Sequence, residues 1–213
     1  MALRNHEDHV FINCPFDSAY LDMYRACIFA ITDAGFIPRC SKEVNNSAQF
    51  RLNSIVNIIS ECRYGIHDLS RVELDKEHDL PRFNMPFELG IFYGAIHFGK
   101  TSHKSKCCLI LERDPFRYQK YISDISGFDV TSHNNNPEEL ISGIRSWLHT
   151  SSQRNNIPTD VQIIERFKLF QDDIKQLCSN HNIEYDLMSF RDFYKNIADW
   201  LRRNEVVCTP LFG

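Results

Sequence analysis

Two carboxylates are the side chains of this 213-residue chain best suited to chemistry. Glu88 is the single acid within segment 82–99, RFNMPFELGIFYGAIHFG, and Asp68 lies at the end of the strand-like segment 64–69. A helix through segment 82–99 would place Glu88 on one face with three apolar residues, Ile91, Phe92 and Ala95. Packing that face beneath a sheet withdraws the carboxylate from bulk water, which costs free energy. Two such carboxylates at one edge suit acid–base chemistry or stabilisation of an oxocarbenium ion.

Each acid also has a structural interpretation. Pro86 suits the first position of a helix, which would put Glu88 at the third position. There the exposed amides and the helix dipole favour a carboxylate by about 0.3–1 kcal/mol. Asp68, at a strand end, can cap a turn. The residues alone leave these interpretations open, so the elements that position the two acids matter.

Apolar strand-like runs alternate with amphipathic helices along most of the chain. The expected strands are 10–12, 36–40, 64–69, 107–111 and a short fifth near 128–131. Four helices are expected as well. The first begins after Asp17 or Ser18 and the second carries the stripe Leu52, Ile55, Val56 and Ile59. The third contains Glu88, and the fourth spans 138–149. This alternation predicts an α/β fold with a parallel sheet covered on both faces.

The composition changes after Thr150. Segment 151–156, SSQRNN, is typical of a linker, and two amphipathic helices are expected beyond it. Thr159 and Gln162 form a capping box for the first, and Ser189 caps the second. We therefore divide the chain into an α/β domain, residues 1–150, and a C-terminal helical appendage, residues 151–213. This helical hairpin is expected to pack against the main domain or to form the contact of a homo-oligomer or of an activating partner.

Polar side chains follow the expected strands. In an open parallel sheet the ligand crevice lies beyond the carboxyl ends of the strands, where the strand order reverses. Asn13, Arg39 and Ser70 come to that edge in addition to the two acids, although Arg39 also suits a solvated surface and Asn13 a hydrogen bond to neighbouring backbone. Arg51, in the first turn of its helix, suits either a phosphate contact or the solvated face.

Composition excludes several functions. The net charge of −4 and pI of about 6.1 lack the basic footprint of extended nucleic-acid binding. No stretch approaches the roughly 18 apolar residues of a membrane helix. Eight cysteines without a C-x-x-C pair are expected to be reduced thiols in a cytoplasmic protein, and neither they nor the nine histidines have metal-ligand spacing. Dinucleotide-fingerprint, Walker A and serine-hydrolase motifs are absent.

Three segments carry a resemblance to known families. They are VFINCPFD at 10–17, DLS at 68–70 and ELGIFYGA at 88–95. Over residues 9–112 this order resembles the nucleoside 2-deoxyribosyltransferase family and is also similar to TIR domains. Both families are flavodoxin-like, and their enzymatic members attack N-glycosidic bonds. The resemblance implies a flavodoxin-like, doubly wound parallel sheet of four to five strands.

The resemblance also implies roles for individual residues. Glu88 would be the nucleophile of the transferases or the essential carboxylate of the TIR NAD glycohydrolases, and Asp68 would help to hold the base or ribose. Pro15 and Phe16 would line the nucleoside pocket. The polar groups of Asn13, Asp17 and Ser70 would lie close by. Asn84 would supply a contact in segment 82–87, where the transferases have a D-S-G-T-type turn.

The expected function is therefore cleavage of a nucleotide N-glycosidic bond. NAD is the favoured substrate, because nicotinamide in NAD is already a cationic leaving group and needs less acid assistance than a neutral base. No cofactor is expected, with NAD or another nucleotide serving as substrate. Resemblance to bacterial TIR effectors implies a role in antiphage defence. The alternatives are a deoxyribosyltransferase or nucleoside monophosphate glycosidase, and a non-catalytic TIR-like interaction or nucleotide-sensing module.

Overall fold

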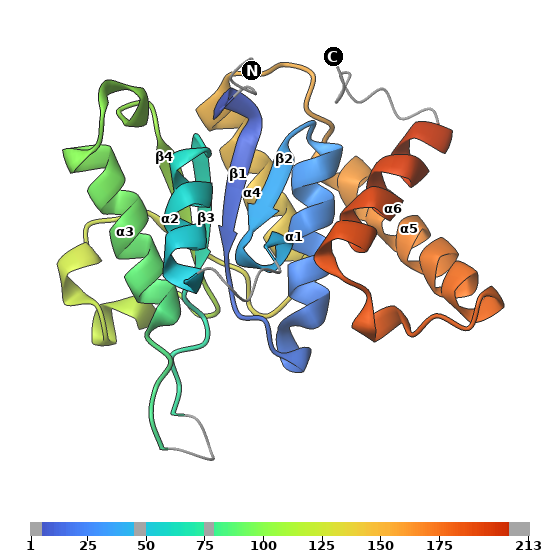
Figure 1. Ribbon diagram of the computed structural model, residues 1–213, viewed down its shortest axis with the longest axis horizontal. Helices are drawn as coiled ribbons and strands as arrows, with labels where there is room; N and C mark the ends of the chain where they lie inside the picture. Colours follow the sequence, from blue (N-terminus) through green and yellow to red (C-terminus); the bar gives the residue numbers. More distant parts are fainter. Residues whose placement is uncertain (1–5, 45–49, 75–78, 205–213) are drawn as a thin grey trace.

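A five-stranded parallel sheet forms the centre of the molecule (Figure 1). The computed structural model describes residues 6–44, 50–74 and 79–204. The strand order is β2-β1-β3-β4-β5, which is the flavodoxin-like order and confirms the predicted fold class. The strands are β1 (His9–Asn13), β2 (Ile37–Cys40), β3 (Tyr64–Asp68), β4 (Cys107–Glu112) and β5 (Val130–Ser132).

The strand order reverses between β1 and β3, so the ligand crevice of such a sheet is expected there. All five residues of each of these two strands are buried, because helices cover both faces of the sheet. Asn13, the last residue of β1, is paired in register with His67 of β3. We call the edge at which the five strands end the carboxyl edge.

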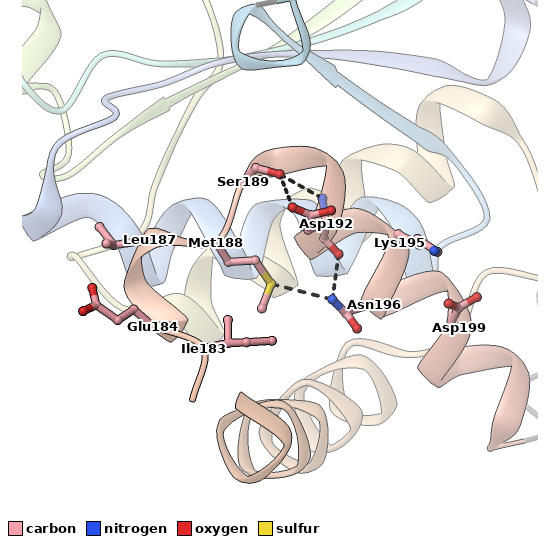
Figure 2. Close-up of a pocket in the computed structure, with 9 residues that line it drawn as sticks. All are labelled: Ile183, Glu184, Leu187, Met188, Ser189, Asp192, Lys195, Asn196 and Asp199. Atoms are coloured by element: carbon pink, nitrogen blue, oxygen red, sulfur yellow. Dashed lines mark hydrogen bonds between the residues drawn. The ribbon is translucent and has the colours of Figure 1, made fainter. Parts of the chain in front are cut away.

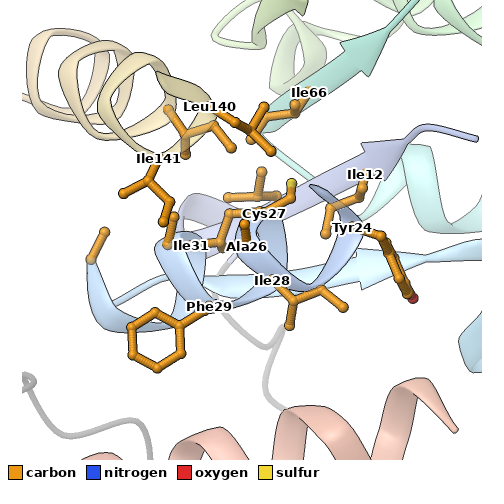
Figure 3. Packing of buried hydrophobic residues seen from close by; sticks show 14 of the residues in the cluster. Ile12, Tyr24, Ala26, Cys27, Ile28, Phe29, Ile31, Ile66, Leu140 and Ile141 are labelled. Carbon is orange, nitrogen blue, oxygen red and sulfur yellow. The ribbon is translucent and has the colours of Figure 1, made fainter. Parts of the chain in front are cut away.

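Two helices cover each face of the sheet. On one face, α1 (Leu21–Asp33) and α4 (Pro137–Ser152) bury a core that includes Ile12 of β1 and Ile66 of β3 (Figure 3). On the other, α2 (Arg51–Ser60) and α3 (Asn84–Phe98) pack over Phe11 of β1. Successive residues of β1 thus point to opposite faces, as the strand period of two requires.

The C-terminal hairpin packs against the sheet domain as an outer layer on α1 (Figure 1). It consists of α5 (Asp160–Asn180) and α6 (Phe190–Arg203). The ring of Phe29 in α1 lies 5.4 Å from the rings of both Phe167 and Phe170 in α5. These rings belong to the same core cluster as β1 and β3. The apolar face that was expected to seek a partner is therefore covered by the chain's own α1.

The element boundaries confirm most of the capping predictions and correct two positions. The capping box of Thr159 and Gln162 is present, and the side chain of Ser189 caps α6. Helix α4 continues to Ser152, so the predicted linker begins inside a helix. Helix α3 begins at Asn84, two residues before the predicted start, because its first turn is held at the carboxyl edge.

Candidate functional site

Asn13 joins β1, β3 and α3 at the carboxyl edge. Its side chain is 2% exposed, and its Nδ2 donates a hydrogen bond to the carbonyl oxygen of Met85 at 2.8 Å. The same nitrogen lies 3.0 Å from Nδ1 of His67. Met85 belongs to the first turn of α3, so this one amide positions the start of that helix against the ends of two strands.

The contacts of Asn13 also define the protonation state of His67. Because Nδ2 must donate to the carbonyl of Met85, it also donates to Nδ1 of His67, which leaves the imidazole proton on Nε2. Burial lowers the pKa of His67 to about 3, so the ring is neutral. Its centroid lies 5.0 Å from that of Phe92 in α3. His67 therefore acts as an uncharged support beneath α3.

Glu88 lies in the second turn of α3 and is only 8% exposed. The interpretation that Glu88 is a first-turn acid is wrong, because the helix begins at Asn84 and has no acid in its first turn. Glu88 follows Met85 by three residues and precedes the fully buried Phe92 by four. At the helical rise it lies about 6 Å from Phe92 along the axis, on the side of Met85 and Asn13.

The carboxylate of Glu88 has no hydrogen bond or ion pair with any residue that the structure describes. Burial raises the pKa of Glu88 to about 7, and the positive charge of Arg51 at the start of α2 reduces that shift. At neutral pH the group is thus present in both protonation states. A buried acid with unoccupied oxygens and such a pKa can transfer a proton or stabilise a positive charge on a ligand.

Asp68 is in a different situation, because it has no exposed surface. Its Oδ2 accepts hydrogen bonds from the hydroxyl of Tyr20 and, at 2.9 Å, from Nε2 of His133, and its Oδ1 accepts from the amide of Ser70 at 2.8 Å. Burial alone would raise the pKa of Asp68, but these three hydrogen bonds and the electrostatic attraction of His133 outweigh it and leave the pKa below its ordinary value. Asp68 is therefore an ionised acceptor that organises the carboxyl edge, with no oxygen exposed to a substrate.

Tyr20 and His133 are the residues of this network that sequence reasoning missed. The amide of Asn135 donates to Nδ1 of His133 at 3.1 Å, so the imidazole proton is on Nε2 and points to Asp68. The one sequence signal for His133 is its position just after the fifth strand. Tyr20, in a turn before α1, gives no such signal.

The loop after β1 has the composition of a pocket wall. Pro15 is buried and Phe16 is half-buried, with its ring 5.3 Å from that of Tyr24 in an edge-to-face arrangement. Asp17 accepts a hydrogen bond from the amide of Tyr20 at 3.1 Å and forms an ion pair with Arg71 at 3.2 Å. The Asp17 contact links this loop to the segment that follows β3.

Ser70 and Asn84 lie on either side of the segment that connects β3 to α3. Ser70 is 1% exposed, and its hydroxyl has no hydrogen-bond partner among the residues that the structure describes. A buried hydroxyl without a partner costs free energy, so this oxygen is a natural ligand contact. Asn84 is the first residue of α3 and is exposed. Both residues stay predicted substrate contacts.

The structure does not place Arg39 among the substrate contacts. Its guanidinium forms ion pairs with Glu43 at 2.8 Å and Glu61 at 3.0 Å, and it also contacts His9 at 3.1 Å. Glu61 is the residue that ends α2, and His9 begins β1. Arg39 therefore joins β2 to the end of α2 through ion pairs, and its role in substrate binding stays a prediction.

A separate groove of about 690 Å³ lies on the C-terminal hairpin, between the turn η7 (Tyr185–Leu187) and α6 (Figure 2). Its polar groups bond mainly to one another. The hydroxyl of Ser189 donates to Asp192 at 2.7 Å, and Asn196 donates to the carbonyl of Asp192 at 2.9 Å. The first contact is at the start of α6 and the second lies within that helix, and the hairpin covers the α1 side of the sheet, opposite α3. The groove is therefore not part of the carboxyl-edge site.

Comparison of the chain with protein-family models, curated proteins and solved structures gave no significant match. Within residues 6–44, 50–74 and 79–204, no group of three or more His, Cys, Asp and Glu side chains could hold a metal ion. No helix in that part of the chain is long and apolar enough to cross a membrane. The described cysteines are free thiols, and Cys208 lies outside the described residues.

Proposed function

We propose that this chain is a nucleotide N-glycosidase, with NAD as the favoured substrate and Glu88 as the catalytic carboxylate. One observation carries the proposal: Glu88 is buried at the point where the strand order reverses, yet it has no partner among the described residues. A partnerless buried carboxylate destabilises a fold, so its retention favours a role in chemistry. The motif resemblance of residues 9–112 supports the same conclusion.

The reaction breaks the bond between C1′ of the ribose and the nitrogen of the base. As the bond lengthens, its electron pair leaves with the base, and positive charge develops on the sugar. The carboxylate of Glu88 would stabilise that charge or bond to C1′, and water would then add to C1′ and lose a proton. Nicotinamide leaves NAD as a neutral molecule, so no protonation of the leaving group is required.

The hydrogen bonds of Asp68 favour NAD over a neutral nucleoside. Departure of a neutral base usually requires an acid that protonates it. Asp68 cannot serve, because it is an ionised acceptor with no exposed oxygen. A site with one available carboxylate suits a leaving group that is already cationic.

A second candidate is a nucleoside monophosphate glycosidase. The pKa of Glu88, about 7, supports it, because the protonated fraction of Glu88 could itself protonate a neutral base. The two candidates require opposite protonation states of the same group, so pH dependence distinguishes them. A role in antiphage defence is supported only by the resemblance to TIR domains.

Incubation of the purified protein with NAD tests the first candidate. We expect release of nicotinamide, measured by chromatography, and a loss of at least about 100-fold in the Glu88→Gln variant. Glu165→Gln, at an exposed position on α5, is the matched control and should retain full activity. Undiminished nicotinamide release by Glu88→Gln would contradict the mechanism. Release of bases from nucleoside monophosphates but not from NAD would favour the second candidate.

A further inference from the structure

Two exposed cations near the end of β2 lack, among the described residues, the carboxylate partners that Arg71 and Arg117 have. Arg71 and Arg117 pair with Asp17 and Glu112, at 3.2 and 2.7 Å. By contrast, Arg51 and Lys42 form no ion pair with any residue in the described part of the chain. Both charges face solvent at one edge of the sheet, so together they would attract an anionic ligand.

Arg51 is anchored at the end of β2. Its Nη2 donates a hydrogen bond to the hydroxyl of Ser41 at 3.1 Å, and its charge is close enough to affect the carboxyl group of Glu88. Ser41 is 8% exposed and follows directly after β2, so it is a well-ordered anchor for the guanidinium. One hydrogen bond leaves the other donors of Arg51 available for the planar, bidentate contact that arginine makes with phosphate.

Lys42 lies on the other side of the same strand end. Its Nζ is 4.8 Å from the ring centroid of Phe16 and 5.5 Å from that of Tyr24. Cation–π contacts orient an ammonium group without pairing it with an anion, so Lys42 stays available to an anionic ligand. Phe16 belongs to the predicted nucleoside pocket, which places this charge at the wall of that pocket.

The strand order gives the spacing between the polar groups. Arg51 and Lys42 lie at the end of β2, Asn13 with the start of α3 at the end of β1, and Ser70 just after β3. The distance from β2 to β3 is two strand spacings, or about 10 Å. This distance matches the length of a nucleoside monophosphate from its phosphate to its base. Glu88 follows, by one helical turn, the residue of α3 that is bonded to Asn13 at the end of β1.

We propose that Arg51 and Lys42 bind a phosphate of the substrate, so that the nucleotide lies across the carboxyl ends of β2, β1 and β3. The phosphate is held at β2, C1′ lies beside Glu88, and the base points toward the hydroxyl of Ser70. This assignment rests on the proposed function for the identity of the ligand as a nucleotide. It favours phosphorylated nucleosides, including dinucleotides, over free nucleosides.

Binding measurements on the Glu88→Gln protein test the assignment without turnover. Calorimetric titration would compare three nucleosides with their 5′-monophosphates: nicotinamide riboside, adenosine and deoxyadenosine. We expect the monophosphate of at least one pair to bind about tenfold or more tightly than its nucleoside. Adding Arg51→Gln or Lys42→Gln should remove most of that gain while leaving nucleoside affinity unchanged. Arg191→Gln, the same charge change at an exposed position of α6, should leave the gain intact.

The Ser70→Ala variant tests the proposed orientation of the nucleotide. It should weaken the binding of nucleoside and of monophosphate by the same factor. Equal affinity of nucleoside and monophosphate in all three pairs would overturn the phosphate site, as would an equal loss for both ligands on Arg51→Gln. Loss of the phosphate gain in Ser70→Ala would overturn the orientation. Because no base release is measured, inactivity toward NAD and failure of phosphate-dependent binding are separate results.

Discussion

Nδ2 of Asn13 donates to the carbonyl oxygen of Met85 at 2.8 Å, and this bond connects two residues that are 72 positions apart in the chain. It closes the first turn of α3 against the end of β1, and Glu88 follows one turn later. The position of the proposed catalytic acid is thus set by an amide that need not touch the substrate. Asn13 is a positioning residue in this arrangement.

Replacing Asn13 with Ala should therefore affect both stability and activity. Loss of these bonds leaves buried Nδ1 of His67 unpaired and removes the side-chain bond to the carbonyl of Met85, which should lower the free energy of unfolding by about 1–3 kcal/mol. Urea denaturation would measure this. Base release should fall as α3 shifts. Asn204→Ala, which removes an exposed bond to Trp200, should change stability by less than about 0.5 kcal/mol. An Asn13→Ala protein as active as the wild type would contradict the positioning role.

The pH dependence of NAD cleavage should follow the ionisation of Glu88. If the carboxylate stabilises the sugar cation, activity requires the ionised form and rises with pH through the pKa of about 7. The rate at pH 8 should exceed that at pH 6 by about tenfold, in proportion to the ionised fraction. Initial rates of nicotinamide release between pH 5 and 9 would show this. A rate that falls over the same range would instead identify Glu88 as a general acid.

The burial of Glu88 should destabilise the folded protein at alkaline pH. Because the folded-state pKa is raised from 4.5 to about 7, the unfolded chain ionises first, and stability falls as pH rises between these values. Glu88→Gln should therefore be more stable than wild type by about 2–3 kcal/mol at pH 8 and of similar stability near pH 4.5. Urea denaturation at both values measures the difference. The Glu165→Gln control should show no such pH-dependent gain.

Loss of the acceptor Asp68 should lower the free energy of unfolding more than loss of one of the donors that bond to it. Asp68→Asn removes an ionised acceptor and places amide hydrogens against buried donors, so it should cost about 2–4 kcal/mol of unfolding free energy. Tyr20→Phe removes one of three donors and should cost about 1–2 kcal/mol. Thermal or urea unfolding of both variants tests the order. A stability of Asp68→Asn equal to that of wild type would contradict the organising role.

Arg39→Gln should separate structural from substrate-binding roles. The variant breaks the ion pairs with Glu43 and Glu61. The free energy of unfolding, measured by urea denaturation, should therefore fall by about 1 kcal/mol or more. The KM for NAD should be unchanged, because the guanidinium is already occupied. A several-fold increase in KM without loss of stability would instead indicate that Arg39 contacts the substrate.

Local patterns were sufficient to predict the elements of this fold. Apolar strands alternating with amphipathic helices predict a covered parallel sheet, because the periodicity of each segment records which of its faces is buried. The cap residues Thr159 and Ser189 could also be predicted, since a helix cap depends on residues within one turn of each other. The first residue of α3 could not be predicted in this way, because a tertiary contact from Asn13 holds the start of that helix.

Local patterns thus predict the strands, the helices and Glu88 as the acid in an apolar helix. Tertiary contacts enclose Asp68 and leave the oxygens of Glu88 without a partner among the described residues, and no local pattern records this. The hydrogen-bond partners Tyr20 and His133 are 48 and 65 residues from Asp68, and no local spacing connects them. Burial and hydrogen bonding are set by segments that meet in space, and these control which carboxylate is available for chemistry.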